Sequence, residues 1–323
     1  MCCGTVYRLS PGNNGNWKYR VIYRFRGPVS DGEAPYGGVI ADSAGNLFGT
    51  ALQRGTGLEC GIVYELSPDG KGNWKEAVLH EFDHSSKGSH RDGCTPSSYL
   101  VFDASGNLFG TTSAGGGVDK NGACENDYYC GTVFELSRKD GKWTEAIIHR
   151  FPETAEDGTE PMSGLVFDHA GNLWGTTFGG GQAGGGTVFE LKPTANGKWK
   201  ESSLFSFSDS ETGTQPYGGL VVDASGNFYG TTFAGGLGAG TVFELTSGRG
   251  GRLTESLVHQ FASCNQAECP DGLDPFGGLT IDSAGNLYGT ATQGGEAGTF
   301  CNGGGNIKVG CGVMFELSPA GIN

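Results

Sequence analysis

Residues 42–50 read Asp42-Ser-Ala-Gly-Asn-Leu-Phe-Gly-Thr50, and closely related stretches follow at intervals of about 60 residues. The later copies begin at Asp103, Asp168, Asp223 and Asp282. Asp-x-x-Gly-Asn is typical of a tight hairpin turn, because Asp accepts hydrogen bonds from its own turn and Gly tolerates positive φ. Internal repetition at this period indicates a repeat architecture.

Three further segments recur around this turn. A Pro-x-x-Gly-[Leu/Val]-x-x-Asp segment, or a looser form of it, precedes each copy, at Pro35, Pro96, Pro161, Pro216 and Pro275. A Gly-x-Val-x-[Glu/Arg]-Leu segment or a close variant occurs six times, from Gly4, Gly61, Gly131, Gly186, Gly240 and Gly312. The last segment runs from Trp17, Trp74, Trp143, Trp199 or Leu253 to Phe25, Phe82, Phe151, Phe207 or Phe261. Each segment is short, rich in β-branched and aromatic residues and bounded by turn residues, which predicts a strand.

The repeat therefore predicts a unit of four antiparallel strands, A to D. In the clearest copy, strand A is 217–222, strand B is 227–232 and strand C is 241–245, and strand D of the preceding copy is 199–207. No stretch has a sustained helical period, so we expect almost no helix. Four strands at this period predict an all-β protein, a β-propeller of five blades. We expect one domain over residues 1–323, with blades at about 35–82, 96–151, 161–207, 216–261 and 275–318.

The strand count leaves two possibilities for the ends of the chain. Strands A, B and D occur five times, whereas strand C occurs six times. Residues 4–25 can supply the missing strand D of the last blade, which closes the ring in the "velcro" manner and leaves no open sheet edge. The alternative is that the chain is a fragment of a six- or seven-bladed propeller.

The repeat also resembles known families. Pro-x-x-Gly-Leu-x-x-Asp-x-x-Gly-Asn-Leu-Tyr is similar to the inner hairpin of NHL and streptogramin-lyase-like β-propellers. The fuller string, with Gly-Asn-Leu-Tyr-Gly-Thr, a Gly-Gly loop and Gly-Thr-Val-Phe-Glu-Leu, more closely resembles the Gloeobacter–Verrucomicrobia (GloVer) tandem repeat of choice-of-anchor proteins. The resemblance implies an exported, often surface-anchored bacterial propeller, and it implies no particular activity.

The net charge and the absence of long apolar runs limit the partners and the cellular location that we expect. The formal net charge is −14, which disfavours nucleic acid as a partner, because phosphate binding needs a Lys/Arg surface. No apolar run is long enough to span a membrane, and no signal peptide is visible at the start. We expect a monomer in an extracellular, periplasmic or cell-surface location.

Ten cysteines favour an oxidising compartment. Three pairs lie close in sequence and predict local disulfides: Cys124 with Cys130, Cys264 with Cys269, and Cys301 with Cys311. Zinc is the alternative, although only the spacing of Cys264 and Cys269 approaches a zinc motif. The pairing of Cys2, Cys3, Cys60 and Cys94 stays open.

Function is expected where the B–C and D–A connections share one face of the blades. The D–A connections carry Asp-Gly pairs at Asp31, Asp92, Asp157 and Asp271, which are either turn chemistry or a ring of carboxylates. Clustered carboxylates would suit Ca²⁺, whereas no other cofactor is evident. Candidate ligand-binding side chains are Tyr36, Tyr217 and Phe276 near the start of strand A, and His84 and His90 in a D–A connection.

Two functions from different classes follow. The first is a binding or surface-interaction scaffold for glycans or cell-envelope polymers. The second is a carbohydrate-active enzyme, a glycoside hydrolase or lyase, that uses two of the four Asp carboxylates as a catalytic pair. An enzyme should show unequal carboxylate environments, whereas a scaffold should show quasi-equivalent sites.

Overall fold

The computed structural model describes most of the chain, namely residues 3–27, 31–53, 60–82, 92–116, 130–152, 156–208, 211–248, 251–262, 269–295 and 312–319. Contacts divide the chain into two compact units, Met1–Pro152 and Glu153–Asn323. Within these residues the helical content is one short 3-10 turn, η1 (Asn13–Gly15). The expectation of an all-β protein with almost no helix is confirmed.

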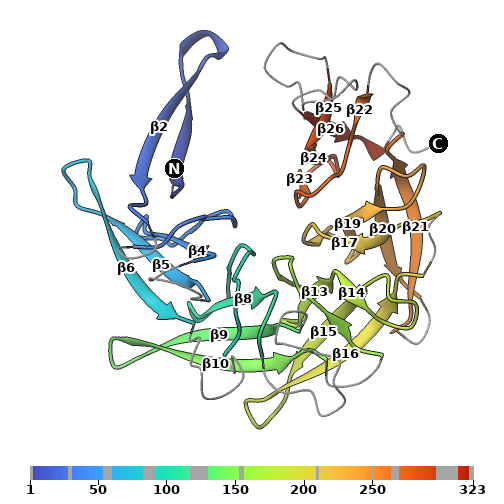
Figure 1. Cartoon of the computed structure of the whole chain (residues 1–323), viewed down its shortest axis with the longest axis horizontal. Coiled ribbons are helices and arrows are strands. Elements are labelled where there is room, and N and C mark those ends of the chain that lie inside the picture. Colours follow the sequence, from blue (N-terminus) through green and yellow to red (C-terminus); the bar gives the residue numbers. More distant parts are fainter. Residues whose placement is uncertain are drawn as a thin grey trace. The chain divides into compact units, whose positions relative to one another are not determined.

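The first unit contains a hairpin and two four-stranded blades, which follow one another in chain order (Figure 1). The hairpin pairs β1 (Thr5–Pro11) with β2 (Trp17–Arg24). The first blade consists of β3 (Ile40–Ala41), β4 (Leu47–Ala51), β5 (Ile62–Pro68) and β6 (Trp74–Glu81). The second blade consists of β7 (Val101–Phe102), β8 (Leu108–Thr112), β9 (Thr132–Lys139) and β10 (Lys142–Arg150).

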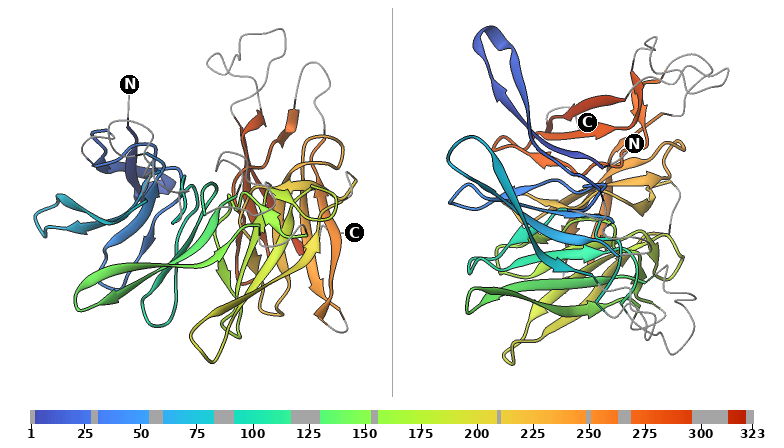
Figure 2. Two further views of the ribbon diagram at one scale, coloured as in Figure 1. Left: turned by 60° about the horizontal axis from the view of Figure 1, so that its bottom comes forward. Right: turned by 60° about the vertical axis from the view of Figure 1, so that its left-hand side comes forward.

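The second unit contains three blades, also in chain order (Figure 2). The third blade consists of β12 (Val166–Phe167), β13 (Leu173–Thr177), β15 (Thr187–Pro193) and β16 (Trp199–Ser206). The fourth consists of β18 (Val221–Val222), β19 (Phe228–Ala234), β20 (Thr241–Ser247) and β21 (Leu253–Gln260). The fifth consists of β23 (Thr280–Ile281), β24 (Leu287–Ala291) and β26 (Val313–Leu317). Short strands β11 (Gly158–Thr159), β14 (Gly179–Gly180), β17 (Thr214–Pro216), β22 (Cys269–Leu273) and β25 (Gln293–Gly295) lie in the connections.

The first four blades have the predicted strand order A-B-C-D with antiparallel pairing, and the fifth has strands A, B and C, so the five-bladed β-propeller architecture is confirmed. Strand A is shorter than predicted: only Val221–Val222 of the expected 217–222 pairs as a strand with β19. The A–B turn is as expected, because both Asp42 carboxylate oxygens accept hydrogen bonds within the turn. Oδ1 accepts from the amides of Ala44 and Asn46, and Oδ2 from the Asn46 side chain.

Glycine is required at two positions of the repeat, because a side chain there would clash with a ring or with the backbone of a neighbouring strand. In strand B, a Cβ on Gly230 would lie 2.5 Å from the Phe243 ring of strand C. The glycine that opens the strand-C segment has positive φ, and its Cα faces a strand-B carbonyl and the next repeat's proline. Gly240, with φ +89°, faces Thr232 and Pro275 in this way.

Neighbouring blades pack through one repeated contact. The phenylalanine that ends strand D meets the strand-C aromatic ring of the following blade edge to face, as in Phe82 with Phe134 and Phe207 with Phe243. A fully buried strand-C valine lies in the same clusters, Val63 in the first and Val188 in the second. Burial of these large apolar side chains is the main source of stability of the array.

The two ends of the repeat are incomplete within the described residues. Strand β1, a strand C by sequence, pairs with β2 alone, and β26 pairs with β24 alone. Closure of the ring through residues 4–25, the fragment alternative and the single-domain boundaries stay predictions.

Candidate functional site

Within each unit, the B–C and D–A connections are hydrogen-bonded to each other on one side of the blades. In the second unit, β11 pairs with β14, β17 with β19, and β22 with β25. In the first unit, the bridges Glu33↔Gln53 and Cys94↔Ala114 occupy the same places.

The residue before each repeated proline is held in the left-handed region, although none of the five is glycine. Its φ lies between 53° and 60°, at Ala34, Thr95, Glu160, Gln215 and Asp274. Its amide and carbonyl join neighbouring segments: Thr95 N donates to Cys60 O, and Thr95 O accepts from Ser113 N. Positive φ is costly for a non-glycine residue and disfavoured before proline, so the sequence alone did not predict it.

Three of the predicted Asp carboxylates make hydrogen-bond contacts with side chains of strand D, and so do more than stabilise their own turns. Asp31 accepts a hydrogen bond of 2.5 Å from the Tyr23 hydroxyl and one from the Arg26 amide. Asp92 lies 3.3 Å from His80 Nε2, and Asp271 lies 3.1 Å from His259 Nε2. These contacts recur at the same repeat position, which makes the three sites quasi-equivalent.

Asp157 and the two loop histidines complete the list of predicted polar residues. Asp157 is buried, and its Oδ1 accepts a hydrogen bond from Gly158 N. His84 and His90 lie outside the described residues. Ligand atoms of His149, Asp157 and Glu201 lie within 4.8 Å of one another. One histidine nitrogen and two carboxylates still fall short of the six to eight oxygens that Ca²⁺ takes. The Ca²⁺ suggestion stays a prediction.

Strand D contributes a carboxylate that sequence reasoning missed. Glu76, Glu145, Glu201 and Glu255 occupy one repeat position, and each has a buried Oε1. Within the described residues, Oε1 of Glu145 makes no hydrogen bond. Burial raises the pKa of Glu145 from 4.5 to about 7; nearby Asp92 adds to the increase, and His80 and Arg150 oppose it. The recurring residue two positions after the strand-D Trp was the available signal.

We expect the Glu145 carboxyl to make folding stability pH-dependent. The folded state holds its proton up to about pH 7, whereas the unfolded chain releases it near pH 4.5, so stability falls as pH rises between those values. Glu145→Gln should therefore be more stable than wild type at pH 8, by about 2 kcal/mol, and nearly equal to it at pH 4. Urea unfolding of both proteins at the two pH values measures this difference. An equal difference at both pH values would contradict the assignment.

The predicted aromatic residues lie on the B–C/D–A surface in both units. In the second unit, the Tyr217 ring contacts Phe276 at 4.7 Å and Phe178 at 6.0 Å between centroids. Phe233 lies 4.9 Å from Phe276 at an interplanar angle of 31°. All four rings are partly exposed, and we call Phe178, Tyr217, Phe233 and Phe276 the aromatic platform. Sequence reasoning found Tyr217 and Phe276 but missed Phe178 and Phe233, each of which directly follows a strand-B Thr-Thr pair.

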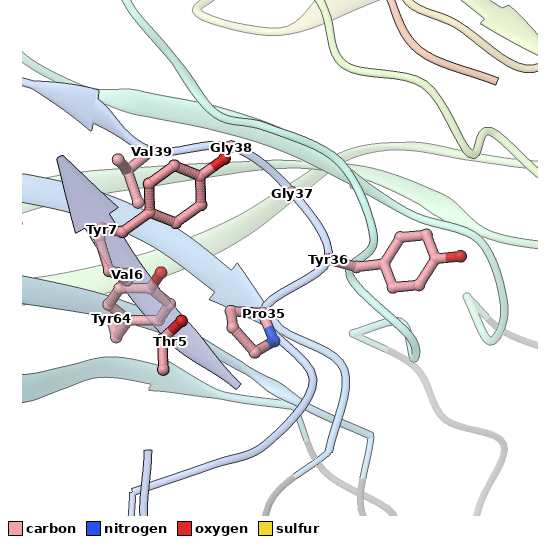
Figure 3. A pocket seen from close by; sticks show the side chains of 9 residues that line it. All are labelled: Thr5, Val6, Tyr7, Pro35, Tyr36, Gly37, Gly38, Val39 and Tyr64. Atoms are coloured by element: carbon pink, nitrogen blue, oxygen red, sulfur yellow. The ribbon is translucent and has the colours of Figure 1, made fainter. Parts of the chain in front are cut away.

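Tyr36, the equivalent residue of the first unit, is 67% exposed and lines a pocket of about 420 Å³. Val6, Tyr7, Val39 and Tyr64 also line it. Figure 3 shows the Tyr36 ring pointing away from the Tyr7 and Tyr64 rings. The Tyr64 hydroxyl is buried and, within the described residues, has no hydrogen-bond partner, and its burial raises the Tyr64 pKa.

One disulfide has both of its cysteines among the described residues. It joins Cys60 to Cys94, two residues whose pairing the sequence left open. Cys3 and Cys130 are also disulfide-bonded. Cys124, Cys264, Cys301 and Cys311, and the side chain of Cys269, lie outside the described residues, so the three predicted local pairings stay predictions. The Cys60–Cys94 bond fastens the B–C connection of the first blade to the D–A segment that precedes the second.

Solved structures of low sequence identity share this fold. A proposed gluconolactonase matches with a TM-score of 0.51 and 15% identity, over 96% of this chain and 80% of that one. An α-L-arabinanase from Penicillium chrysogenum, solved with arabinobiose, matches with a TM-score of 0.50 and 15% identity, over 97% and 86% of the two chains. Similarity at this identity shows the propeller fold alone.

Sequence comparisons place the chain in a family. No characterised protein in the curated set has significant sequence similarity to it. No helix among the described residues has the length and apolar character needed to cross a membrane. The model of the Gloeobacter/Verrucomicrobia repeat matches residues 121–322. The blades, the strand order and this match together show that the chain belongs to the Gloeobacter/Verrucomicrobia repeat family.

Proposed function

We propose that this chain is an exported bacterial binding scaffold that takes glycans on the aromatic platform of its second unit. The observation that carries the proposal is the contact chain from Phe178 through Tyr217 and Phe276 to Phe233, which remains partly exposed. Most aromatic rings of strands B and C are buried in the blades, so the platform is a distinct surface feature. Flat apolar rings beside polar groups suit the alternating apolar and hydroxyl surfaces of a sugar.

Polar side chains beside the platform supply hydrogen-bonding groups. Glu160, Gln215 and Asp274 are held at positive φ in the connections that lead to the platform, and Gln293 Nε2 donates to Asp274 Oδ2 at 2.8 Å. Burial raises the pKa of the Glu160 and Asp274 carboxyls. Left-handed non-glycine residues that persist in a rigid scaffold are typical of functional surfaces.

The charge of the residues around the platform determines which class of glycan is expected to bind. Residues 156–182, 211–239 and 269–295, which form the platform and its surroundings, contain no Lys or Arg. A uronate or sulfated polymer would therefore meet carboxylates without a compensating cation. The expected ligands are neutral or amino-sugar polymers.

The platform residues are the first to test. We expect Tyr217→Ala/Phe276→Ala to lose at least about tenfold in affinity for the glycan that binds wild type, because aromatic anchors dominate binding energy. Leu237→Ala, an exposed apolar residue of the connection that follows Phe233, is the matched control and should bind as wild type does. An array of cello-, xylo-, arabino- and chito-oligosaccharides, followed by calorimetry, measures both effects. Unchanged affinity in the double variant would exclude the platform.

A carbohydrate-active enzyme is the second candidate, supported by the Glu145 carboxyl. Its pKa of about 7 beside Asp92 gives two carboxyls in unequal environments, as glycosidic cleavage requires. The recurrence of the Asp–strand-D contact at Asp31 and Asp271 instead favours a role in blade architecture. Turnover of any of the four oligosaccharides that is lost in both Glu145→Gln and Asp92→Asn would support the enzyme over the scaffold.

A further inference from the structure

Basic residues are concentrated at the tips of the C–D hairpins. In the first four blades the tips are residues 67–75, 137–144, 192–200 and 246–254, which lie between the leucine of strand C and the repeated glutamate of strand D. The tips contain ten of the 21 basic residues of the chain and two of its 35 acidic residues. The ten are Lys71, Lys75, Arg138, Lys139, Lys142, Lys192, Lys198, Lys200, Arg249 and Arg252. The tips are therefore positively charged, although the formal net charge of the chain is −14.

Each tip extends past the rest of its blade. In the third blade, β13 pairs with β15 as far as Leu191, whereas Lys192 and Pro193 pair with β16 alone. In the second blade, β8 pairs with β9 as far as Leu136, and the remainder of β9 pairs with β10 alone (Figure 1). Every basic residue of the tips that the structure describes is exposed. Because strand C runs from the B–C connection to the tip, each tip lies at the opposite end of its blade from that connection.

The two acidic residues of the tips have roles in turns. Asp69 Oδ1 accepts hydrogen bonds from the amides of Lys71 and Asn73, and its Oδ2 accepts one from the Asn73 side chain. The side-chain bond from Asn73 and these amide bonds hold the pKa of Asp69 below its usual value. Asp140 and Gly141 have φ of 51° and 78°, as a two-residue type I′ hairpin turn requires. Both acidic residues are therefore explained by the hairpins themselves.

The lysines of the tips have no comparable role in the fold. Lys139 lies directly opposite Lys142 across hairpin β9–β10, and Lys192 lies directly opposite Lys200 across hairpin β15–β16. Like charges in directly opposite positions destabilise a hairpin. Lys192 is ion-paired with Glu190 at 2.8 Å, whereas the ammonium groups of Lys139, Lys142 and Lys200 make no ion pair with any described residue. These three cations can therefore bind an anionic partner without breaking a contact within the chain.

The side chains of the tips favour a flexible chain of phosphates. Seven of the ten basic residues are lysines, and the lysine ammonium binds phosphate as a point charge without requiring one orientation. Within the described residues, none of the exposed large apolar side chains lies in these tips. The tips therefore offer no ring on which a base could stack and no apolar anchor for a bilayer. A polymer that contacts several lysines gains affinity through effective concentration, which a free phosphate ion does not.

We propose that the tips of the C–D hairpins bind a linear, base-free phosphate polymer. The lysines of hairpins β9–β10 and β15–β16 supply the main contacts. In the second unit, the connections around the platform contain no Lys or Arg, so the same polymer is repelled from that end of the blades. The polymer therefore leaves the aromatic platform free, and the proposal is independent of the glycan site.

Titration of fluorescently labelled long-chain inorganic polyphosphate with the full chain, over a series of salt concentrations, tests the proposal. We expect wild type to bind, with an affinity that falls as salt rises, because bound phosphates release their counterions. Lys139→Glu/Lys200→Glu should bind at least about tenfold more weakly and with a shallower dependence on salt. Each substitution also replaces a like-charged pair by an opposite-charged one, so the variant should unfold at the same or a higher urea concentration. Loss of binding without loss of stability separates a binding role from a structural one.

The matched control is Arg8→Glu/Arg24→Glu, which makes the same change in net charge at two exposed residues outside the tips. It should bind polyphosphate within about twofold of wild type, because its arginines contact no phosphate. An equal loss of affinity in this control would show that net charge alone matters, and would overturn the proposal. Absence of binding by wild type at low salt would overturn it as well.

Two further anionic probes test the class of partner. Oligothymidylate and vesicles of phosphatidylglycerol with phosphatidylcholine should both bind more weakly than polyphosphate, because the tips have neither a stacking ring nor an apolar anchor. Equal or tighter binding of oligothymidylate would assign the tips to nucleic acid, and equal or tighter binding of the vesicles would assign them to a lipid surface. Either result would overturn the proposal.

Discussion

Gly240→Ala is expected to destabilise the fold by about 3 kcal/mol, more than most single substitutions. Gly240 has φ +89°, which costs an L-residue about 1–2 kcal/mol. Its new Cβ would also lie 2.4 Å from the Thr232 carbonyl oxygen and 2.8 Å from Pro275 Cδ, and neither atom belongs to a flexible side chain. Relieving such a contact typically costs a further 1–3 kcal/mol, roughly.

The control for this substitution lies two residues away. Gly238 has φ +97°, and no atom lies within 4 Å of the position that an alanine Cβ would occupy there, so Gly238→Ala carries the conformational cost without the steric one. Urea unfolding of both variants separates the two costs, and Gly240→Ala should be the less stable by roughly 1–3 kcal/mol. Equal stabilities would show that the strand-C glycine is chosen for its φ alone.

Replacing Cys60 and Cys94 together by alanine is expected to cost about 3–4 kcal/mol. The bond closes a loop with a sequence separation of 34, and its loss releases conformational entropy in the unfolded chain. The bond also stands beside two backbone hydrogen bonds between the connections, Cys94 N to Ala114 O and Thr95 N to Cys60 O.

Alanine is the appropriate replacement, because Cys60 is fully buried and a serine hydroxyl there would add a desolvation penalty of its own. Urea unfolding of the double alanine variant and wild type, both under oxidising conditions, gives the difference. A change of less than about 0.5 kcal/mol, the size of an ordinary surface substitution, would contradict a stabilising role.

The blades were predictable because their signals are local. The Asp42 turn hydrogen-bonds as its sequence indicates, and the predicted strand C at 241–245 is the core of β20. Strand A was overestimated because its first residues, from Tyr217 to Leu220, lie next to the left-handed Gln215, which directs the chain before regular pairing begins.

The site was predictable only in part, because its geometry comes from contacts between repeats. Asp92 was singled out for its Asp-Gly turn, whereas its partner His80 was not among the candidate site residues. Glu145 carries no local signal of burial; its environment comes from the preceding repeat, which supplies His80 and Asp92. Cys60 and Cys94 are distant in sequence, and only the pairing of connections brings them together.

The platform shows the same division between local and non-local signals. Tyr217 and Phe276 stood out as aromatic residues after a repeated proline. Phe233 is placed beside Phe276 by the packing of the fourth blade on the fifth, and Phe178 beside Tyr217 by the packing of the third on the fourth. A surface assembled from three repeats has no single stretch of sequence that describes it.

Calorimetric titration of the full chain with a neutral or amino-sugar oligosaccharide selected on the array, with mass analysis of the sugar afterwards, shows whether the platform binds glycans without cleaving them. If the chain is a binding scaffold, we expect wild type to bind the sugar, Tyr217→Ala/Phe276→Ala to bind it at least about tenfold more weakly, and the oligosaccharide to be recovered intact. Cleavage of the sugar by wild type that survives in the platform variant and disappears in Glu145→Gln would contradict it.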